Sequence, residues 1–359
     1  MGEPEVPLKD ASDMLSAIAS LPQQLDEGYA QARAELAGVD LSRAAAGGAR
    51  PTGVVVCGMG GSAIGADVVL ACLPALAVPA VVVRGYDLPV WVDPRTLMIA
   101  VSYSGDTEET LSCVQTALER GCVPLCVASG GALAALAVER GLPLVRVSSG
   151  VQPRAALGRL AMPLAAALER AGLTEGFAAQ VREAATLVRS MAADFGPDVP
   201  AELNQAKTIA TRLRDHMVLV YGAGLTAPAA RRWKTQINEN AKAPAAYAEL
   251  PELDHNEVMG WTAAPELSRR LHVVLLEDEH MPARLQRRFH LTLAEVEAHA
   301  GGVERIITHG ASPLARLLSV LYLGDWVSYY LAGLYGVDPT PVEAIQRLKR
   351  LLAAGDGDG

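Results

Sequence analysis

Lysine is scarce in this 359-residue chain, and basic residues as a whole are outnumbered by acidic ones. Lysine and arginine together number 31, against 40 aspartates and glutamates, which gives a formal net charge of −9. This balance leaves no basic stripe for a phosphate backbone, so we expect no nucleic-acid partner. An anionic ligand would need a local site. The few lysines stand out where arginine would be the default cation: Lys9, Lys207, Lys234, Lys242 and Lys349.

Cysteine is also rare, and the five thiols lack the C-x-x-C pairing of structural zinc sites. We expect them to be buried, reduced thiols of a cytoplasmic protein. The first ten residues are polar and acidic, unlike a secretory signal. The longest apolar stretch, residues 314–335, is interrupted by Arg316 and Asp325. It therefore predicts a buried helix, and we expect no membrane partner.

Short apolar segments alternate with helical segments over most of the chain. Seven segments read as buried strands: 53–57, 79–83, 97–102, 123–128, 216–221, 272–276 and 303–308. Helices are predicted around and between them: 10–37, 62–73, 107–120, 227–241, 283–300, 313–335 and 341–352. Such alternation predicts an α/β protein with parallel sheets that helices cover on both faces.

A helical block at 153–214 separates two αβα halves, although we find no strong residue-level repeat between them. The chain is therefore divided into an N-terminal helical segment (1–50), a first subdomain (51–152), a helical connector (153–214), a second subdomain (215–340) and a C-terminal helix with a disordered tail (341–359). In open parallel sheets, ligands bind beyond the carboxyl ends of the strands. The loops after the strands are where chemistry is expected.

A glycine-rich loop, Gly58 to Ser62, follows the first predicted strand and leads into a helix. At Gly60 and Gly61 the backbone can approach a ligand closely, and the helix start offers N–H groups to an anion. Ala63 occupies the third glycine position of a dinucleotide fingerprint, and there is no Walker loop. Alone, this loop indicates an anion site weakly, and a plain tight turn is the alternative.

The loop after the third predicted strand is rich in hydroxyl groups. Ser102, Ser104 and Thr107 lie on a turn that enters a helix, so they can surround a phosphate together with main-chain N–H groups. A helix cap would use one of these hydroxyls and leave the others surplus. With Ser62 from the first loop, the pattern predicts a site for a phosphate monoester.

These loops resemble the sugar-isomerase (SIS) domain through V-x-x-x-G-x-G-G-S and the later S-x-S-G-x-T-x-E-T. Over residues 50–352 the chain resembles, more narrowly, the bifunctional phosphoglucose/phosphomannose isomerases of archaea and bacteria. The motifs that carry this resemblance are GMGGSAIG, VSYSGDTEETL, PRAALG, NENAKAP, DHNEVMGW and AIQRLKRLL. One departure is Asp106, where the family usually has Asn. A carboxylate near a phosphate is repulsive, so we expect Asp106 to point away from the ligand.

The resemblance implies two SIS-type αβα subdomains and a set of catalytic residues. Glu239 would carry the proton between C1 and C2 of the sugar, and His255 would open the ring from across a dimer interface. Lys349 on the last helix would assist ring opening, and Arg154 would stabilise the enediolate. The implied protein is a homodimer with shared active sites that acts on glucose 6-phosphate, mannose 6-phosphate or both.

No metal or other cofactor is expected, because the seven histidines show no zinc-ligand spacing such as H-E-x-x-H. Three alternatives stay open. A non-catalytic SIS module would need the phosphate loops without Glu239, His255 and Lys349. A nucleotide-dependent oxidoreductase would need the glycine register that Ala63 breaks. An isomerase acting on another sugar phosphate would keep the same site.

Overall fold

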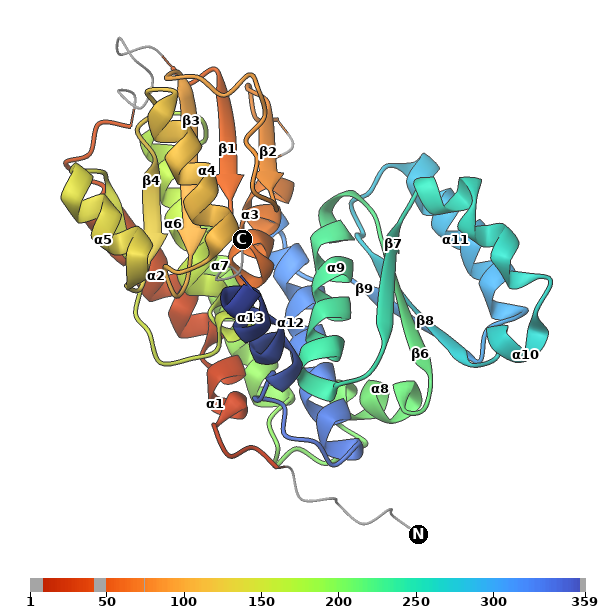
Figure 1. Ribbon diagram of the computed structural model, residues 1–359. Coiled ribbons are helices and arrows are strands. Elements are labelled where there is room, and N and C mark those ends of the chain that lie inside the picture. The colour runs from red at the N-terminus through yellow and green to blue at the C-terminus, as the bar shows by residue number, and fades with distance from the viewer. Residues whose placement is uncertain (1–8, 42–49, 74, 356–359) are drawn as a thin grey trace.

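The computed structural model describes residues 9–41, 50–73 and 75–355 and contains two parallel sheets (Figure 1). All paired strands in both sheets run parallel. The predicted α/β class with parallel sheets is therefore confirmed. Residues 356–359 of the predicted disordered tail lie outside the described residues.

The first sheet has the strand order β2-β1-β3-β4-β5. Its strands are β1 (Gly53–Cys57), β2 (Ala80–Val83), β3 (Thr96–Ser102), β4 (Leu125–Ala128) and β5 (Leu144–Arg146). The central strands β1, β3 and β4 are buried throughout, as expected for parallel strands covered on both faces. Because Cys57 pairs with Ala100, the loops after β1 and β3 leave the sheet side by side.

Helices cover the first sheet on both faces (Figure 1). On one face, α4 (Glu108–Glu119) and α5 (Gly131–Arg140) bury Cys113 and Leu133 in the cluster that holds Met98 and Ala100. On the other face, α3 (Gly60–Ala71) and α6 (Leu157–Arg170) share a cluster with Val54. The N-terminal helices are α1 (Met14–Ala19) and α2 (Leu21–Glu35), and α2 packs on α6.

The second sheet has the order β7-β6-β8-β9. Its strands are β6 (Met217–Gly222), β7 (Ala245–Glu249), β8 (Leu271–Glu277) and β9 (Gly302–Ile307). One face packs on α9 (Ala227–Gln236) and α12 (Pro313–Leu334), and the other on α11 (Ala283–Glu297) with residues 250–261. The latter segment contains the short helices η4 (Glu252–His255) and η5 (Glu257–Trp261), and α10 (Pro265–Ser268) follows it.

The helix α12 joins the two halves into one core. It packs against α9 and against the connector helices α7 (Phe177–Asp194) and α8 (Gln205–Leu213). By length and composition it could cross a membrane, but 94% of its most apolar window is buried inside the molecule. The prediction of a buried helix is thus confirmed, as is that of five buried, unpaired cysteines.

The sequence missed the helices α5 and α10 and the edge strands β5 and β7. It also missed how the helix after β6 ends, since α9 passes into a π-helical turn, η3 (Ile237–Ala241). The segment between β5 and α6 contains a short 3₁₀ helix, η1 (Pro153–Ala155). The last helix, α13 (Glu343–Gly355), begins soon after α12.

Candidate active site

The glycine-rich loop after β1 packs directly against the segment that carries Arg154. A Cβ atom at Gly61 would lie 2.6 Å from the carbonyl oxygen of Pro153, so only glycine fits there without displacement. Ser62 is buried, and its Oγ accepts a hydrogen bond from the main-chain N–H of Tyr103 at 3.3 Å. This loop therefore contacts both the loop after β3 and the start of η1.

The loop after β3 directs its hydroxyls toward one another and toward the start of α4. Ser102 Oγ donates to Thr107 Oγ1 at 2.8 Å and accepts from the N–H of Gly105 at 3.1 Å. Thr107 occupies the N-cap position of α4, yet its side chain makes no capping hydrogen bond. Ser104 is exposed. Helix capping therefore does not account for the Thr107 hydroxyl.

Asp106 uses its carboxylate within the protein. Its Oδ1 accepts a hydrogen bond at 2.8 Å from the main-chain N–H of Ala132, in the first turn of α5. Negative charge is favourable at a helix N-terminus. A Cβ atom at Gly131 would lie 2.6 Å from this oxygen, so the carboxylate packs closely on the helix start. Asp106 thus acts as a cap for α5.

Arg154 lies at the junction of the two halves. The residue is only 4% exposed. Its Nε donates to Asn240 Oδ1 at 2.7 Å, and its Nη2 donates to the carbonyl oxygens of Pro339 at 2.7 Å and Thr340 at 3.0 Å. Its Nη1 lies 3.4 Å from Glu239 Oε2. Burial lowers the pKa of Arg154, and the Glu239 carboxylate opposes that shift. The guanidinium stays charged and aimed at Glu239.

Glu239 sits in the π-helical turn η3, which ends the helix after β6. Turns of this kind are rare and frequently occur at functional sites. The neighbouring residues Ile237 and Ala241 are buried, whereas the Glu239 side chain is 30% exposed. The turn therefore fixes the backbone in the core and leaves the carboxylate accessible.

Lys242 follows the turn with a left-handed backbone, at φ 57°. Its Nζ donates to the carbonyl oxygens of Glu239 and, at 2.9 Å, of Pro339. Burial and the nearby Arg154 lower the pKa of Lys242, against the attraction of Asp338 and Glu239. Two cations, Arg154 and Lys242, thus hold the chain before α13 against the turn that carries Glu239.

His255 lies on the opposite side of the second sheet from Glu239. It ends η4, whose Leu253 packs in the cluster with Phe289 of α11. The turn of Glu239 instead belongs to the cluster of α9 and α12 on the other face. The two residues also flank opposite ends of β7, whose five residues span about 16 Å. The His255 ring is exposed, and this chain alone does not bring it to Glu239.

Lys349 is exposed on α13, and no described contact joins it to Glu239 or to the loops. The same helix exposes an apolar stripe: Ile345 is 42% exposed, Leu348 59% and Leu351 62%. Glu343, at the start of α13, is close enough to influence the pKa of Lys242. The helix therefore begins beside the Glu239 turn and continues into solvent.

The structure brings most of the predicted site residues together. Contacts run from the Ser102–Thr107 turn through Tyr103 to Ser62, from Gly61 to the Arg154 segment, and from Arg154 to Glu239. His255 and Lys349 stand apart from this group within the chain.

Sequence reasoning missed the residues that hold this group in place. Asn240 and Lys242 lie within the motif NENAKAP, but Asn240 accepts from Arg154, 86 positions earlier, and Lys242 donates to Pro339, 97 positions later. No local pattern signals such pairings. The one sequence feature that draws attention to Lys242 is its type, because most basic residues of this chain are arginines.

Within residues 9–41, 50–73 and 75–355, no three or more His, Cys, Asp or Glu side chains are arranged to hold a metal ion. The polar side chains that contact Glu239 are the Arg154 guanidinium and the Lys242 ammonium. Such groups suit an anionic organic ligand.

Comparison with known proteins agrees with this arrangement. Residues 202–352 match the family model of the bacterial phospho-glucose isomerase C-terminal SIS domain. A bifunctional phosphoglucose/phosphomannose isomerase of Caldicellulosiruptor bescii is 37% identical over 95% of this chain and 99% of its own. A protein of the same name from Aquifex aeolicus is 39% identical over 84% of this chain and 90% of its own.

Among solved structures, a hypothetical protein from Thermus thermophilus superposes with a TM-score of 0.73 at 18% identity. The match covers 98% of this chain and 92% of that protein, so the tandem fold is shared over its whole length. The level of identity to the two curated relatives, over nearly their full length, shows the family directly. The chain belongs to the bifunctional phosphoglucose/phosphomannose isomerase family of SIS-domain proteins.

Proposed function

We propose that this protein is a metal-independent isomerase that interconverts glucose 6-phosphate, mannose 6-phosphate or both with fructose 6-phosphate. The observation that carries the proposal is the Arg154–Glu239 pair at 3.4 Å, beside the two hydroxyl-bearing loops. A sugar six carbons long has its phosphate at one end and its reacting carbons at the other. A site for such a sugar therefore needs phosphate-binding groups close to the groups that transfer the proton.

The phosphate would be held by neutral donors. Ser62, Ser102, Ser104 and Thr107 supply hydroxyls, and the starts of α3 and α4 supply N–H groups with a favourable dipole. The backbone at Gly60 and Gly61 would let the ester approach closely. With the phosphate fixed, the open-chain sugar would extend toward Arg154 and Glu239.

Glu239 would move one proton between the first two carbons. It takes the C2 proton of the aldose while the C1 oxygen gains a proton, which gives a cis-enediol. It then returns the proton to C1 as the C2 hydroxyl loses its own. Arg154 would stabilise negative charge on the two oxygens during this transfer, because its Nη1 is held toward the carboxylate. A positioned base typically supplies about 10²–10⁴-fold in rate.

The site would be completed by a second copy of the chain. His255 is separated from Glu239 of its own chain by the second sheet, so its role in ring opening requires a partner. The exposed apolar stripe on α13 supports association, since such a surface is otherwise costly in water. Lys349, on the same helix, would assist ring opening. We therefore propose a cytoplasmic homodimer with shared active sites.

The main test is a coupled assay of fructose 6-phosphate formation from each C2 epimer. We expect wild-type protein to convert at least one epimer and to remain active in EDTA. The Glu239→Gln variant should bind sorbitol 6-phosphate normally but lose at least about 10³-fold in kcat, because a base is removed with little change of shape. Near-wild-type turnover by this variant would refute the mechanism.

The shared site has a separate test, by mixing two inactive variants. Glu239→Gln and His255→Ala subunits are unfolded and refolded together in equal amounts. Half of the resulting dimers are mixed, and each mixed dimer has one intact site, so about a quarter of wild-type activity should return. No recovery, despite mixed dimers seen by native mass spectrometry, would place His255 outside the partner's site.

The alternative functions differ in which of these site residues they would not need. A phosphosugar-sensing SIS module would use the loops and would not need a carboxylate paired with Arg154, so it predicts binding without turnover. An isomerase for another sugar phosphate predicts turnover of neither epimer above but of a different aldose or ketose phosphate. The same coupled assay and a calorimetric titration separate these cases.

A further inference from the structure

A charged residue interrupts the most apolar helix of the molecule. Asp325 lies in the middle of α12 and is 4% exposed. It faces Arg232 of α9, which is 2% exposed, and the two make a bidentate pair at 2.8 Å for both contacts. Gln236 donates to the same carboxylate at 2.9 Å. None of the proposed chemistry uses this pair.

Two chains of hydrogen bonds lead from the pair to the residues that do the chemistry. In the first, Arg232 Nη2 donates to the main-chain oxygen of Arg154 at 2.7 Å. In the second, the Asp325 carbonyl accepts from Ser328 Oγ at 2.7 Å, and Ser328 Oγ accepts from Asn240 at 2.9 Å. Asn240 in turn accepts from the Arg154 guanidinium.

A contribution to folding stability does not explain why this buried ion pair is present. Removing two charges from water costs several kcal/mol per ion, and apolar residues of similar size are often equally or more stabilising in their place. Burial raises the pKa of Asp325, and the Arg232 guanidinium opposes this rise. Apart from Arg316 near its start, the rest of α12 consists of apolar, small or hydroxyl-bearing residues that carry no charge.

We propose that the Asp325–Arg232 pair is a positioning device, which fixes both the Arg154 main chain and the turn that carries Glu239. The inference rests on the proposed isomerase function. Arg232 bonds to Arg154 of η1, and the Asp325 carboxylate bonds to Gln236, the residue directly before η3. The pair therefore sets the distance between the guanidinium and the base. Neither residue touches the substrate in this scheme.

The test replaces the pair by apolar side chains. The double variant Asp325→Val/Arg232→Met should fold, with a Tm within a few degrees of wild type. Its kcat should fall about 10- to 100-fold while KM changes less than about threefold, since the phosphate loops are untouched. Ser328→Ala, which cuts only the second chain of bonds, should lower kcat about fivefold with the same KM and is a small enough change to fold.

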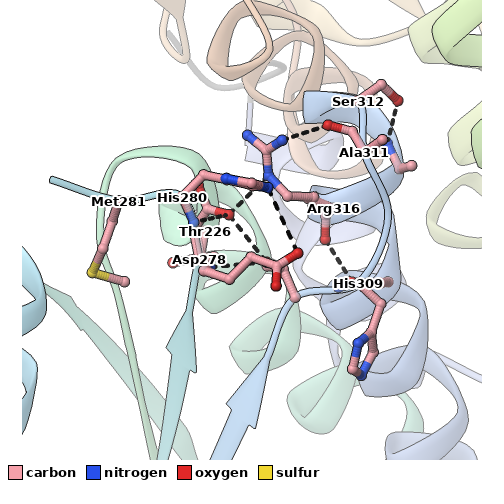
Figure 2. A network of polar contacts seen from close by, with 12 residues as sticks. Thr226, Asp278, His280, Met281, His309, Ala311, Ser312 and Arg316 are labelled. Carbon is pink, nitrogen blue, oxygen red and sulfur yellow. Dashed lines mark hydrogen bonds and ion pairs between the residues drawn. The ribbon is translucent and has the colours of Figure 1, made fainter.

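A matched control pair lies near the N-terminal end of α12. Arg316 Nε pairs with Asp278 Oδ1 at 2.9 Å, with side chains 12% and 8% exposed, in the network of Figure 2. This pair lies nine residues before Asp325, about 14 Å along the helix. The double variant Asp278→Val/Arg316→Met should change Tm as the first double variant does, without lowering kcat.

The possible outcomes distinguish a failure of the positioning proposal from a failure of the proposed isomerase function. An inactive wild type would overturn both. An active wild type with equally active Asp325→Val/Arg232→Met and Ser328→Ala variants would overturn the inference alone. A fall in kcat in both double variants would also overturn it, because the effect would then be one of general stability. If the first double variant fails to fold, Gln236→Leu, which removes the bond between the Asp325 carboxylate and the residue before η3, decides by its kcat and KM.

Discussion

The two halves of the molecule share one scaffold and differ in one loop. Each sheet has the same order over four strands, with β1 and β6 in equivalent places. Each of these strands is followed by G-x-G and, two residues later, a hydroxyl: Gly60 and Ser62 in the first half, Gly224 and Thr226 in the second. The two glycines have nearly the same φ, 49° and 52°.

The difference lies in the next loop along each sheet. After β3 the first half has the neutral hydroxyls Ser102, Ser104 and Thr107. After β8 the second half has three carboxylates, of which Glu277 pairs with Arg305, and Asp278 pairs with Arg316 as Figure 2 shows. An anionic ester would meet repulsion at the second loop and neutral donors at the first.

The second half contributes from its other edge instead. Its α9 returns to the amino ends of the strands, and the π-helical turn there presents Glu239 to Arg154. Under the proposed mechanism, the duplicated scaffold would supply the phosphate-binding loops from one half and the base from the other. Function follows the side chains on the loops and not the fold that repeats.

Within this comparison of the two halves, the largest expected effect comes from giving the first half a carboxylate like those of the second. Ser104→Asp should raise KM for the sugar phosphate about 100-fold, because two unit charges about 4 to 5 Å apart repel by roughly 3 kcal/mol at an effective dielectric constant near 20. Ser104 is exposed, so stability should hardly change. Steady-state kinetics and calorimetry with sorbitol 6-phosphate measure the effect.

The matched control exchanges the residues in the opposite direction. Glu279→Ser, in the loop after β8, should leave both KM and kcat at wild-type values, because no ester binds there. A KM for Ser104→Asp within threefold of wild type would show that the ester does not approach this loop. A changed KM in Glu279→Ser would contradict the assignment of the second loop as inert.

The Lys242→Gly substitution tests the turn that carries Glu239, and its expected effect on the kinetics is smaller. Glycine removes the left-handed strain, about 1–2 kcal/mol, but also the ammonium bonds to Glu239 and Pro339. We expect an unchanged or higher Tm and a kcat lowered about three- to tenfold. Asp215 has a similar φ of 65°, so Asp215→Gly should relieve the same strain without a kinetic effect. Equal kinetics in both variants would remove Lys242 from the site.

The sequence predicted this fold well in its buried parts and poorly at its edges. Seven of the nine described strands were predicted, because runs such as Thr96–Ser102 are long, wholly buried and mostly apolar. The missed strands, β5 and β7, are edge strands of three and five residues, and β7 reads AAYAE, without a β-branched residue. Edge strands bury less and so carry weaker patterns.

For the candidate site too, some parts could be predicted from the sequence and others could not. The two loops proposed to bind the phosphate could be picked out from the sequence because each follows its strand directly. The Asp325–Arg232 pair was not, since its partners are separated by 93 positions, although the charge within an apolar run was visible. The repeat of the G-x-G loop also escaped notice, because only its two glycines and a hydroxyl match.

The smallest expected effect concerns Asp106, the one departure from the family pattern. Because its carboxylate caps α5 and is not aimed at the phosphate, Asp106→Ala should cost about 1 kcal/mol of stability and leave KM within twofold. Asp106→Asn keeps an acceptor and should retain most of the stability. Thermal unfolding and steady-state kinetics of the two variants measure this. A tenfold fall in KM for Asp106→Ala would instead mean that the carboxylate repels the ester, and that the first loop is only partly neutral.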